Sequence, residues 1–181
     1  VYGYLKGTGN TVVKQMWILY NDFGDAIGIT YEGISYYYIK NLQGDVIGLL
    51  NGSGNVVARY VYDAWGNLIS VKTSGGQVIT DEAHIALQNP LRNRGYVYDT
   101  ETGLYYVSGR YYDSEVGRFI NADDPEILLE DQDNLLQYNL FAYCFNNPVN
   151  MFDLTGESPA NIIGGIIGGV AGAALGYLLA D

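Results

Sequence analysis

Residues 89–125 read NPLRNRGYVYDTETGLYYVSGRYYDSEVGRFINADDP, and this stretch contains the same short unit twice, as YDTETG from Tyr98 and as YDSEVG from Tyr112. An Asp at the start of a turn accepts hydrogen bonds from the backbone that follows it. A Gly a few residues later supplies the positive φ that closes a hairpin. The aromatic and β-branched residues on either side suit a pleated, half-buried surface. The stretch therefore predicts β-hairpins.

Similar units occur upstream, with Asp or Asn before Gly and apolar runs on both sides. They are found at 20–24, 38–45, 50–55 and 62–67. Residues from about 15 to 120 are therefore predicted to form consecutive β-hairpins, and the fold class is mainly β. The runs Tyr36-Tyr37-Tyr38 and Tyr105-Tyr106 place aromatic rings on both faces of a strand. Such a sheet has no purely polar, solvent-exposed face, or it lines a large interior.

Short helices are expected between and after these hairpins. Residues 80–87 have fewer aromatics and suit a helical turn that ends before Pro90. Residues 124–137 alternate acidic and apolar side chains and are interpreted as a short helix or a partly helical loop. Residues 139–145 fit a short apolar helix or a strand, and Asn146-Asn147-Pro148 is a turn signal.

Composition limits the classes of function. The 181 residues are 48% apolar and 16% charged, which suits one ordinary domain, or a piece of a larger one, that buries a sizeable core. The formal charge of −11 argues against nucleic acid as a partner, because a phosphate backbone requires dense Lys and Arg. The single Cys144 excludes an internal disulfide framework, and we interpret it as a buried thiol. The sequence begins Val-Tyr-Gly-Tyr, which is typical of an internal fragment.

The C-terminal stretch differs in character from the rest of the chain. Residues 160–180 carry no charge, and glycines recur at 164, 168, 172 and 176. This small-xxx-small pattern predicts a glycine-zipper helix, with Ser158-Pro159 at its start. Two readings stay open. The helix enters or crosses a membrane during delivery, or it packs closely inside a shell or against a partner.

The chain resembles the C-terminal part of Rhs/YD-repeat proteins, which ends in the Rhs repeat-associated core. The resemblance covers about residues 35–157. The matching motifs, in chain order, are Tyr62-Asp63-Ala64-Trp65-Gly66-Asn67, the run from Asn89 to Asp99, Thr102-Gly103-Leu104-Tyr105-Tyr106, Gly109-Arg110-Tyr111-Tyr112-Asp113, Gly117-Arg118-Phe119-Ile120-Asn121, Asp123-Asp124-Pro125, Asn139-Leu140-Phe141-Ala142-Tyr143, Asn146-Asn147-Pro148-Val149-Asn150 and Asp153-Leu154-Thr155-Gly156.

The resemblance implies a spiral β-sheet that closes into a hollow shell, with the core as a plug at one end. It implies a division into shell hairpins at 1–80, the core at 81–157 and the start of a variable cargo region at 158–181. The implied function is structural, namely enclosure and presentation of a C-terminal effector by a secreted Rhs-type polymorphic toxin. Adhesion or glycan binding at the cell surface, as in teneurin relatives, is an alternative.

The resemblance also implies a possible enzymatic role, because some relatives are thought to cut their own chain just after the core as aspartyl proteases. That chemistry needs two nearby carboxylates, one ionised and one protonated. The matching candidates are Asp124 and Asp153, with Asp123 as a substitute for Asp124 and Arg118 as the orienting cation. The bond at risk lies near Glu157-Ser158. The chain departs from the usual Asp-Pro-x-Gly pattern at Ile127 and Leu154, and single carboxylates that cap a helix or start a turn are the plainer interpretation.

The remaining expectations concern partners and location. Toxin cargo on the same chain is the main expected partner, an immunity protein is a candidate partner, and residues 160–180 are a candidate membrane contact. The expected location is secreted or on the bacterial cell surface. No cofactor or metal site is expected, because His84 has no partner motif and the acidic cluster of residues 126–133 lacks the spacing of a calcium loop.

Overall fold

A computed structural model describes residues 3–6, 14–123, 139–153, 156 and 160–161. The chain forms two compact units. The first contains residues 1–63 and 68–95, and the second contains residues 64–67 and 96–181. The expected glycine-zipper helix and the expected helix or loop at 124–137 lie outside the described residues, apart from Ala160–Asn161. The expected division of the chain at residues 80 and 157 stays a prediction.

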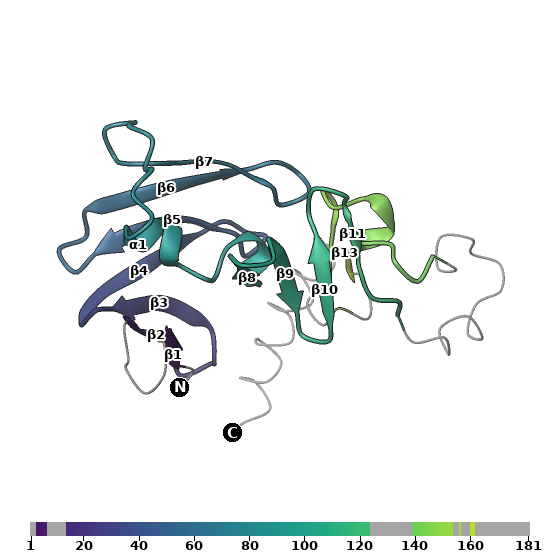
Figure 1. The fold of residues 1–181 in the computed structure, drawn as a ribbon, viewed down its shortest axis with the longest axis horizontal. Helices are drawn as coiled ribbons and strands as arrows, with labels where there is room; N and C mark the ends of the chain where they lie inside the picture. The colour runs from purple at the N-terminus through teal and green to yellow at the C-terminus, as the bar shows by residue number, and fades with distance from the viewer. Residues whose placement is uncertain (1–2, 7–13, 124–138, 154–155, 157–159, 162–181) are drawn as a thin grey trace, which may run out of the picture. The chain divides into compact units, whose positions relative to one another are not determined.

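The first unit is an antiparallel meander of seven strands in which each strand pairs with the next one along the chain (Figure 1). The strands are β1 (Gly3–Lys6), β2 (Lys14–Tyr20), β3 (Ala26–Tyr31), β4 (Ile34–Lys40), β5 (Val46–Asn51), β6 (Val56–Tyr62) and β7 (Leu68–Lys72). The prediction of consecutive hairpins in a mainly β fold is thereby confirmed. Register shifts near the ends of β2, β4, β5 and β6 are the bulges that accompany these turns.

The core of the first unit lies on one face of this sheet. Ile29, Leu49 and Ala58 are fully buried there, beside Tyr60 and Val71. The short helix α1 (Ile85–Gln88) packs its apolar side chains onto the same cluster. His84 caps this helix, because its Nδ1 accepts the Ala86 N–H at 3.1 Å. The helical turn expected around residues 80–87 is therefore present, displaced toward Pro90.

The opposite face of the same sheet also carries large apolar side chains. Strand alternation places Trp17, Tyr37 and Val61 on it, and they are 38, 42 and 47% exposed. The sheet consequently has apolar side chains on both faces, as the Tyr36-Tyr37-Tyr38 run predicts.

The second unit contains a four-stranded antiparallel sheet in the order β11-β10-β9-β8. Its strands are β8 (Val97–Asp99), β9 (Leu104–Val107), β10 (Arg110–Asp113) and β11 (Arg118–Phe119), and a small pair follows, β12 (Met151–Phe152) with β13 (Ala160–Asn161). Its core is aromatic. Tyr105, Tyr112, Phe119 and Tyr143 are at most 1% exposed, and the rings of Tyr112 and Tyr143 lie 4.1 Å apart between centroids.

A left-handed turn follows Tyr143. Cys144, Phe145 and Asn146 have φ angles of 51, 50 and 59°, and none of them is glycine. L-residues adopt this conformation at a cost of roughly 1–2 kcal/mol each, so surrounding contacts must impose it. Cys144 is fully buried, as expected, and the turn replaces the short helix or strand expected for 139–145.

Candidate functional site

Arg110 places a cation inside the second unit. In β10 the side chains alternate, so Arg110 and Tyr112 share the buried face. The Arg110 residue is only 6% exposed, and its guanidinium lies over the Phe119 ring at 3.6 Å from the centroid. Its Nη1 also donates to the Leu140 carbonyl at 3.1 Å. A buried charge is costly unless it is paired, so its position depends on what faces it.

Two carboxylates face Arg110. Asp123 Oδ2 lies 2.8 Å from Nη1, and Asp153 Oδ2 lies 3.5 Å from Nη2. The Asp153 side chain is 1% exposed and that of Asp123 is 12% exposed. One guanidinium therefore offsets the mutual repulsion of two carboxylates in a region that solvent hardly reaches.

The backbone around Asp153 is held at several points. Its Oδ1 accepts the Gly156 N–H at 2.8 Å, so the side chain holds the backbone three residues further on. The Tyr96 hydroxyl donates to the Asp153 carbonyl oxygen and lies 3.3 Å from the Tyr143 hydroxyl. Gly156 has a φ of 75°, and a Cβ at this position would collide with the Val107 carbonyl oxygen. Gly156 is thus packed closely against β9.

The predicted site residues lie in different places. Asp123 and Asp153 both form ion pairs with the Arg110 guanidinium. Asp124 lies outside the described residues. Arg118 is on the exposed face of β11, with its guanidinium 5.3 Å from the Phe141 ring centroid. Among the described residues it contacts no carboxylate. The roles predicted for Asp124, Asp153 and Arg118 stay predictions.

Sequence reasoning missed Arg110, Tyr96 and Tyr143. The sequence did indicate that Arg110 is buried, because Arg110 and Tyr112 are two residues apart in a strand and so lie on the same face. A cation on the apolar face of a strand indicates a buried charge that needs carboxylate partners. Tyr96 and Tyr143 carried no comparable signal, since their hydroxyl partners are distant in sequence.

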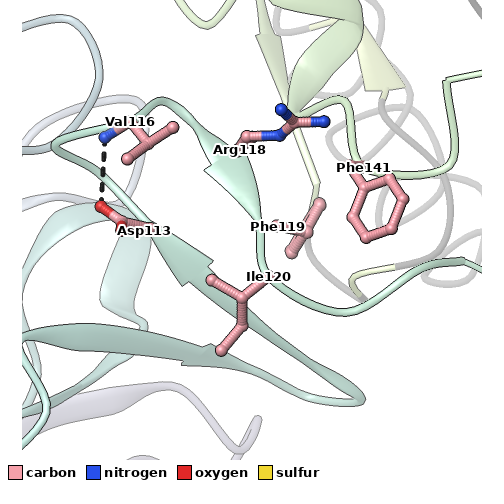
Figure 2. Close-up of a pocket in the computed structure, with 6 residues that line it drawn as sticks. All are labelled: Asp113, Val116, Arg118, Phe119, Ile120 and Phe141. Atoms are coloured by element: carbon pink, nitrogen blue, oxygen red, sulfur yellow. Dashed lines mark hydrogen bonds between the residues drawn. The ribbon is translucent and has the colours of Figure 1, made fainter.

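Arg118 lines a pocket of about 430 Å³ in the second unit. Figure 2 shows Asp113 and Val116 at one end and Phe141 at the other, with Arg118 between them. The Asp113 carboxylate accepts the N–H groups of Glu115 and Val116 at 2.9 and 3.1 Å, so it stabilises its own turn.

Within the described ranges, no three His, Cys, Asp or Glu side chains gather as metal ligands. The acidic cluster at 126–133 lies outside those ranges. None of the described helices is long and apolar enough to cross a membrane.

The fold and the turn motifs define a class of protein that is built from consecutive antiparallel β-hairpins. The chain belongs to the Teneurin YD-shell family, whose model matches residues 10–149. The resemblance to Rhs/YD-repeat proteins is thereby confirmed.

Three known proteins illustrate the similarity. The chain is 42% identical over 155 residues to "tRNA3(Ser)-specific nuclease WapA" of Bacillus spizizenii, covering 85% of this chain and 6% of that protein. It is 36% identical over 129 residues to "Salivary gland surface protein 1" of Aedes aegypti, covering 71% of this chain and 3% of that protein. The crystal structure of TcdB2-TccC3 superposes with a TM-score of 0.64 at 22% identity, covering 85% of this chain and 7% of that chain, and so shows the fold.

The chain thus spans only a small part of the length of the relatives it matches. It is a segment of a YD-repeat shell.

Proposed function

We propose that this segment encloses and presents a C-terminal effector in a secreted Rhs-type toxin. The observation that carries the proposal is the sheet in which each strand from β1 to β7 pairs with the next, with apolar side chains on both faces. A sheet of this kind suits the wall of a shell, because its second apolar face has to meet something other than bulk water. Tyr suits such a wall, since its ring covers apolar area while its hydroxyl meets water or cargo.

The partners and the location follow from the same proposal. The cargo is a toxin on the same chain, an immunity protein neutralises it in the producing cell, and the shell is secreted or displayed on the bacterial surface. Residues 160–180 begin the cargo region and are the segment proposed to contact a membrane. The similarity to a tRNA-specific nuclease of Bacillus spizizenii supports this set of roles.

The test is protease protection in the full-length natural protein. The effector is expected to resist a protease while it is part of the intact chain and to be digested when it is expressed alone. Gly28→Val is expected to abolish the protection, because a Cβ at position 28 would collide with the Tyr36 carbonyl oxygen in the adjacent strand. Gly52→Ala is the matched control, since a Cβ there meets nothing within 4 Å. Digestion of the effector in the intact chain as fast as in isolation would overturn enclosure and would favour the adhesion alternative.

A second candidate function is self-cleavage just after the core. The contact of Arg110 with both Asp123 and Asp153 favours it. Asp123 and Asp153 lie together in a largely buried region, and Asp153 bonds the backbone of Gly156. In the proposed step, one carboxylate takes a proton from water as the water oxygen attacks the carbonyl carbon of the Glu157–Ser158 bond. The other carboxyl group protonates the leaving nitrogen, so a new carboxyl end and a new amine are formed. Arg110, or Arg118 as the sequence predicts, orients the carboxylates.

Intact mass spectrometry of the full-length natural protein tests self-cleavage. A fragment boundary within a few residues of Gly156 is expected in the natural protein. Asp153→Asn is expected to abolish it, and Asp123→Asn and Asp124→Asn together identify the second carboxylate. Comparison of Arg110→Gln with Arg118→Gln identifies the orienting cation. An uncut natural chain would eliminate self-cleavage and leave the enclosure proposal intact.

A further inference from the structure

Three turns of the first unit share one geometry. They begin at Asn21, Asn41 and Asn51, and in each the Asn Oδ1 accepts backbone N–H groups from two and four residues ahead. The first of these bonds is 3.0 Å in all three turns, and the second is 2.8, 2.9 and 2.9 Å. In each turn a Gly three residues on has positive φ and donates its N–H to the Asn carbonyl. The three side chains are therefore held alike, and differences in their chemistry must come from their neighbours.

The first difference is the residue that follows each Asn. Asp22 follows Asn21, Leu42 follows Asn41 and Gly52 follows Asn51, which makes Asn51-Gly52 the one Asn-Gly pair in the sequence. Gly52 is exposed, has an ordinary negative or extended φ, and would present a Cβ to open space. With no side chain in the way, its backbone nitrogen approaches the preceding side chain more freely than a substituted residue does.

The second difference is the carboxamide nitrogen. Asn21 Nδ2 donates to Asp25 Oδ2 at 3.0 Å, and Asn41 Nδ2 donates to Asp45 Oδ2 at 2.6 Å. Position 55 holds Asn instead of Asp, and within the described part of the chain Asn51 Nδ2 donates no hydrogen bond. Deamidation of an Asn removes its Nδ2 nitrogen. A carboxylate holds this nitrogen in the turns at Asn21 and Asn41, and no described carboxylate holds it in the turn at Asn51.

We propose that Asn51 is a site of spontaneous deamidation in the folded chain. The Gly52 backbone nitrogen attacks Asn51 Cγ, forming an N–Cγ bond while the Cγ–Nδ2 bond breaks. The carboxamide nitrogen leaves as ammonia and takes up the proton from the Gly52 amide, and a five-membered succinimide remains. Water opens this ring at either carbonyl, giving aspartate when the backbone carbonyl is kept in the main chain and isoaspartate when the side-chain carbonyl replaces it.

The two products affect the sheet differently. The formal charge changes from −11 to −12 in both, because one neutral amide becomes one carboxylate. The aspartate product keeps both hydrogen bonds that Asn51 Oδ1 accepts, so the turn persists. Isoaspartate lengthens the main chain by one carbon, where Asn51 pairs with Tyr36 and its N–H donates to the Asn55 carbonyl at 2.9 Å. The isoaspartate form is therefore expected to open the β5–β6 hairpin and expose residues 51–55 to proteases.

The experiment is incubation of the full-length natural protein in native buffer, followed by peptide mass spectrometry. Deamidation adds one dalton, and fragmentation that breaks the backbone distinguishes aspartate from isoaspartate. The modified fraction is expected to grow with time at Asn51 and to stay near zero at Asn21 and Asn41. Gly52→Ala is expected to slow the reaction several-fold without disturbing the turn, since Asp22 and Leu42 occupy the same place in the matched turns.

Two further variants separate the two causes. Asn55→Asp supplies the missing carboxylate and is expected to slow the reaction at Asn51. Leu42→Gly supplies a following glycine at Asn41 and is expected to give a rate between those of wild-type Asn41 and Asn51, because the Asp45 carboxylate still holds the amide. Equal rates at the three Asn residues in the folded chain, or reaction at Asn51 only in a denaturant, would overturn the proposal.

Discussion

Arg110 is the residue on which the polar part of the second unit depends. It is 6% exposed and faces Asp123 and Asp153, of which Asp153 is almost fully buried. Removing one partner of a buried ion pair costs about 3–5 kcal/mol, because a charge is left uncompensated. We therefore expect Arg110→Gln to lower the free energy of unfolding by about this amount in urea denaturation.

Arg118→Gln is the matched control for that change. Arg118 is exposed and lies over the Phe141 ring, so its replacement is expected to alter the free energy of unfolding by less than about 0.5 kcal/mol. Arg110→Lys keeps the charge but loses the planar fork, and is expected to fall between the two. Similar losses for Arg110→Gln and Arg118→Gln would contradict the assignment of Arg110 as the buried cation.

At the scale of single residues, the sequence shows that a cation is available but does not show which arginine pairs with the carboxylates. Arg110 and Arg118 both stand beside aromatic residues in strands, and both fit an orienting cation. Which one is buried depends on which face of the four-stranded sheet meets Tyr143, and Tyr143 lies more than twenty residues further along the chain. The sequence likewise does not separate Asp123 from Asp124, because both carboxylates fit the same motif.

At the scale of elements, one hairpin turn is part of the core. Asp45 Oδ1 accepts the Arg94 N–H at 2.7 Å, and Asp45 is 7% exposed, whereas the equivalent Asp25 lies in an exposed turn. Arg94 has a φ of 55°, so this bond also supports a backbone conformation that L-residues rarely adopt. Asp45→Ala is expected to cost about 1–3 kcal/mol in urea denaturation.

Asp25→Ala removes the same side-chain bond to the turn Asn but none to a distant backbone. It is expected to cost no more than about 1 kcal/mol, the worth of an ordinary exposed hydrogen bond. Equal costs for the two substitutions would mean that the bond from Arg94 to Asp45 contributes nothing to stability.

The contact between the sheet and α1 predicts a loss of stability in alkali. Burial raises the pKa of Tyr38 and of Tyr60 well above the ordinary value of 10.0. The Tyr60 hydroxyl donates to the Ala86 carbonyl at 2.8 Å, and that of Tyr38 to Asn89 Oδ1 at 2.9 Å. The pKa values are raised only in the folded state. The two hydroxyls therefore contribute fully to the free energy of unfolding below about pH 10, and this contribution declines as the pH rises toward the folded-state pKa.

The urea midpoint is therefore expected to fall steeply above about pH 10. Tyr38→Phe and Tyr60→Phe are each expected to make that fall shallower, while lowering stability at neutral pH by about 1–3 kcal/mol because a buried partner is left unsatisfied. Tyr37→Phe, on the exposed face of the same strand as Tyr38, is the matched control for the loss of a tyrosine hydroxyl. An identical slope in all four proteins would contradict the prediction.

The elements that sequence predicts well here are those with local causes. Asx residues and glycines specify the hairpin turns within five residues, and strand alternation then assigns the faces. The left-handed turn at Cys144–Asn146 could not be predicted, because Cys144 and Phe145 are residue types that rarely adopt positive φ, and contacts such as those around Tyr143 impose it.

At the scale of the whole molecule, the two units interleave along the chain. Residues 64–67 belong to the second unit, although the strands before and after them, β6 and β7, belong to the first. Within the second unit, the Tyr112 hydroxyl donates to the Trp65 carbonyl at 2.7 Å and that of Tyr105 to the Gly66 carbonyl at 2.9 Å. Unfolding of β6 and β7 would release the chain on both sides of these bonds, so we expect unfolding of the first unit to destabilise the second.

This arrangement predicts a single cooperative unfolding transition, and the two Trp residues provide the measurement. Trp17 lies in β2 of the first unit, and Trp65 lies in the part of the second unit that interrupts the first. Trp17→Phe leaves fluorescence that reports on the second unit, and Trp65→Phe leaves fluorescence that reports on the first. After correction for each variant's own stability by circular dichroism, the fluorescence and dichroism curves are expected to coincide in urea. A fluorescence transition that precedes the dichroism transition in either variant would show that the units unfold independently, and interleaving would then provide no coupling between them.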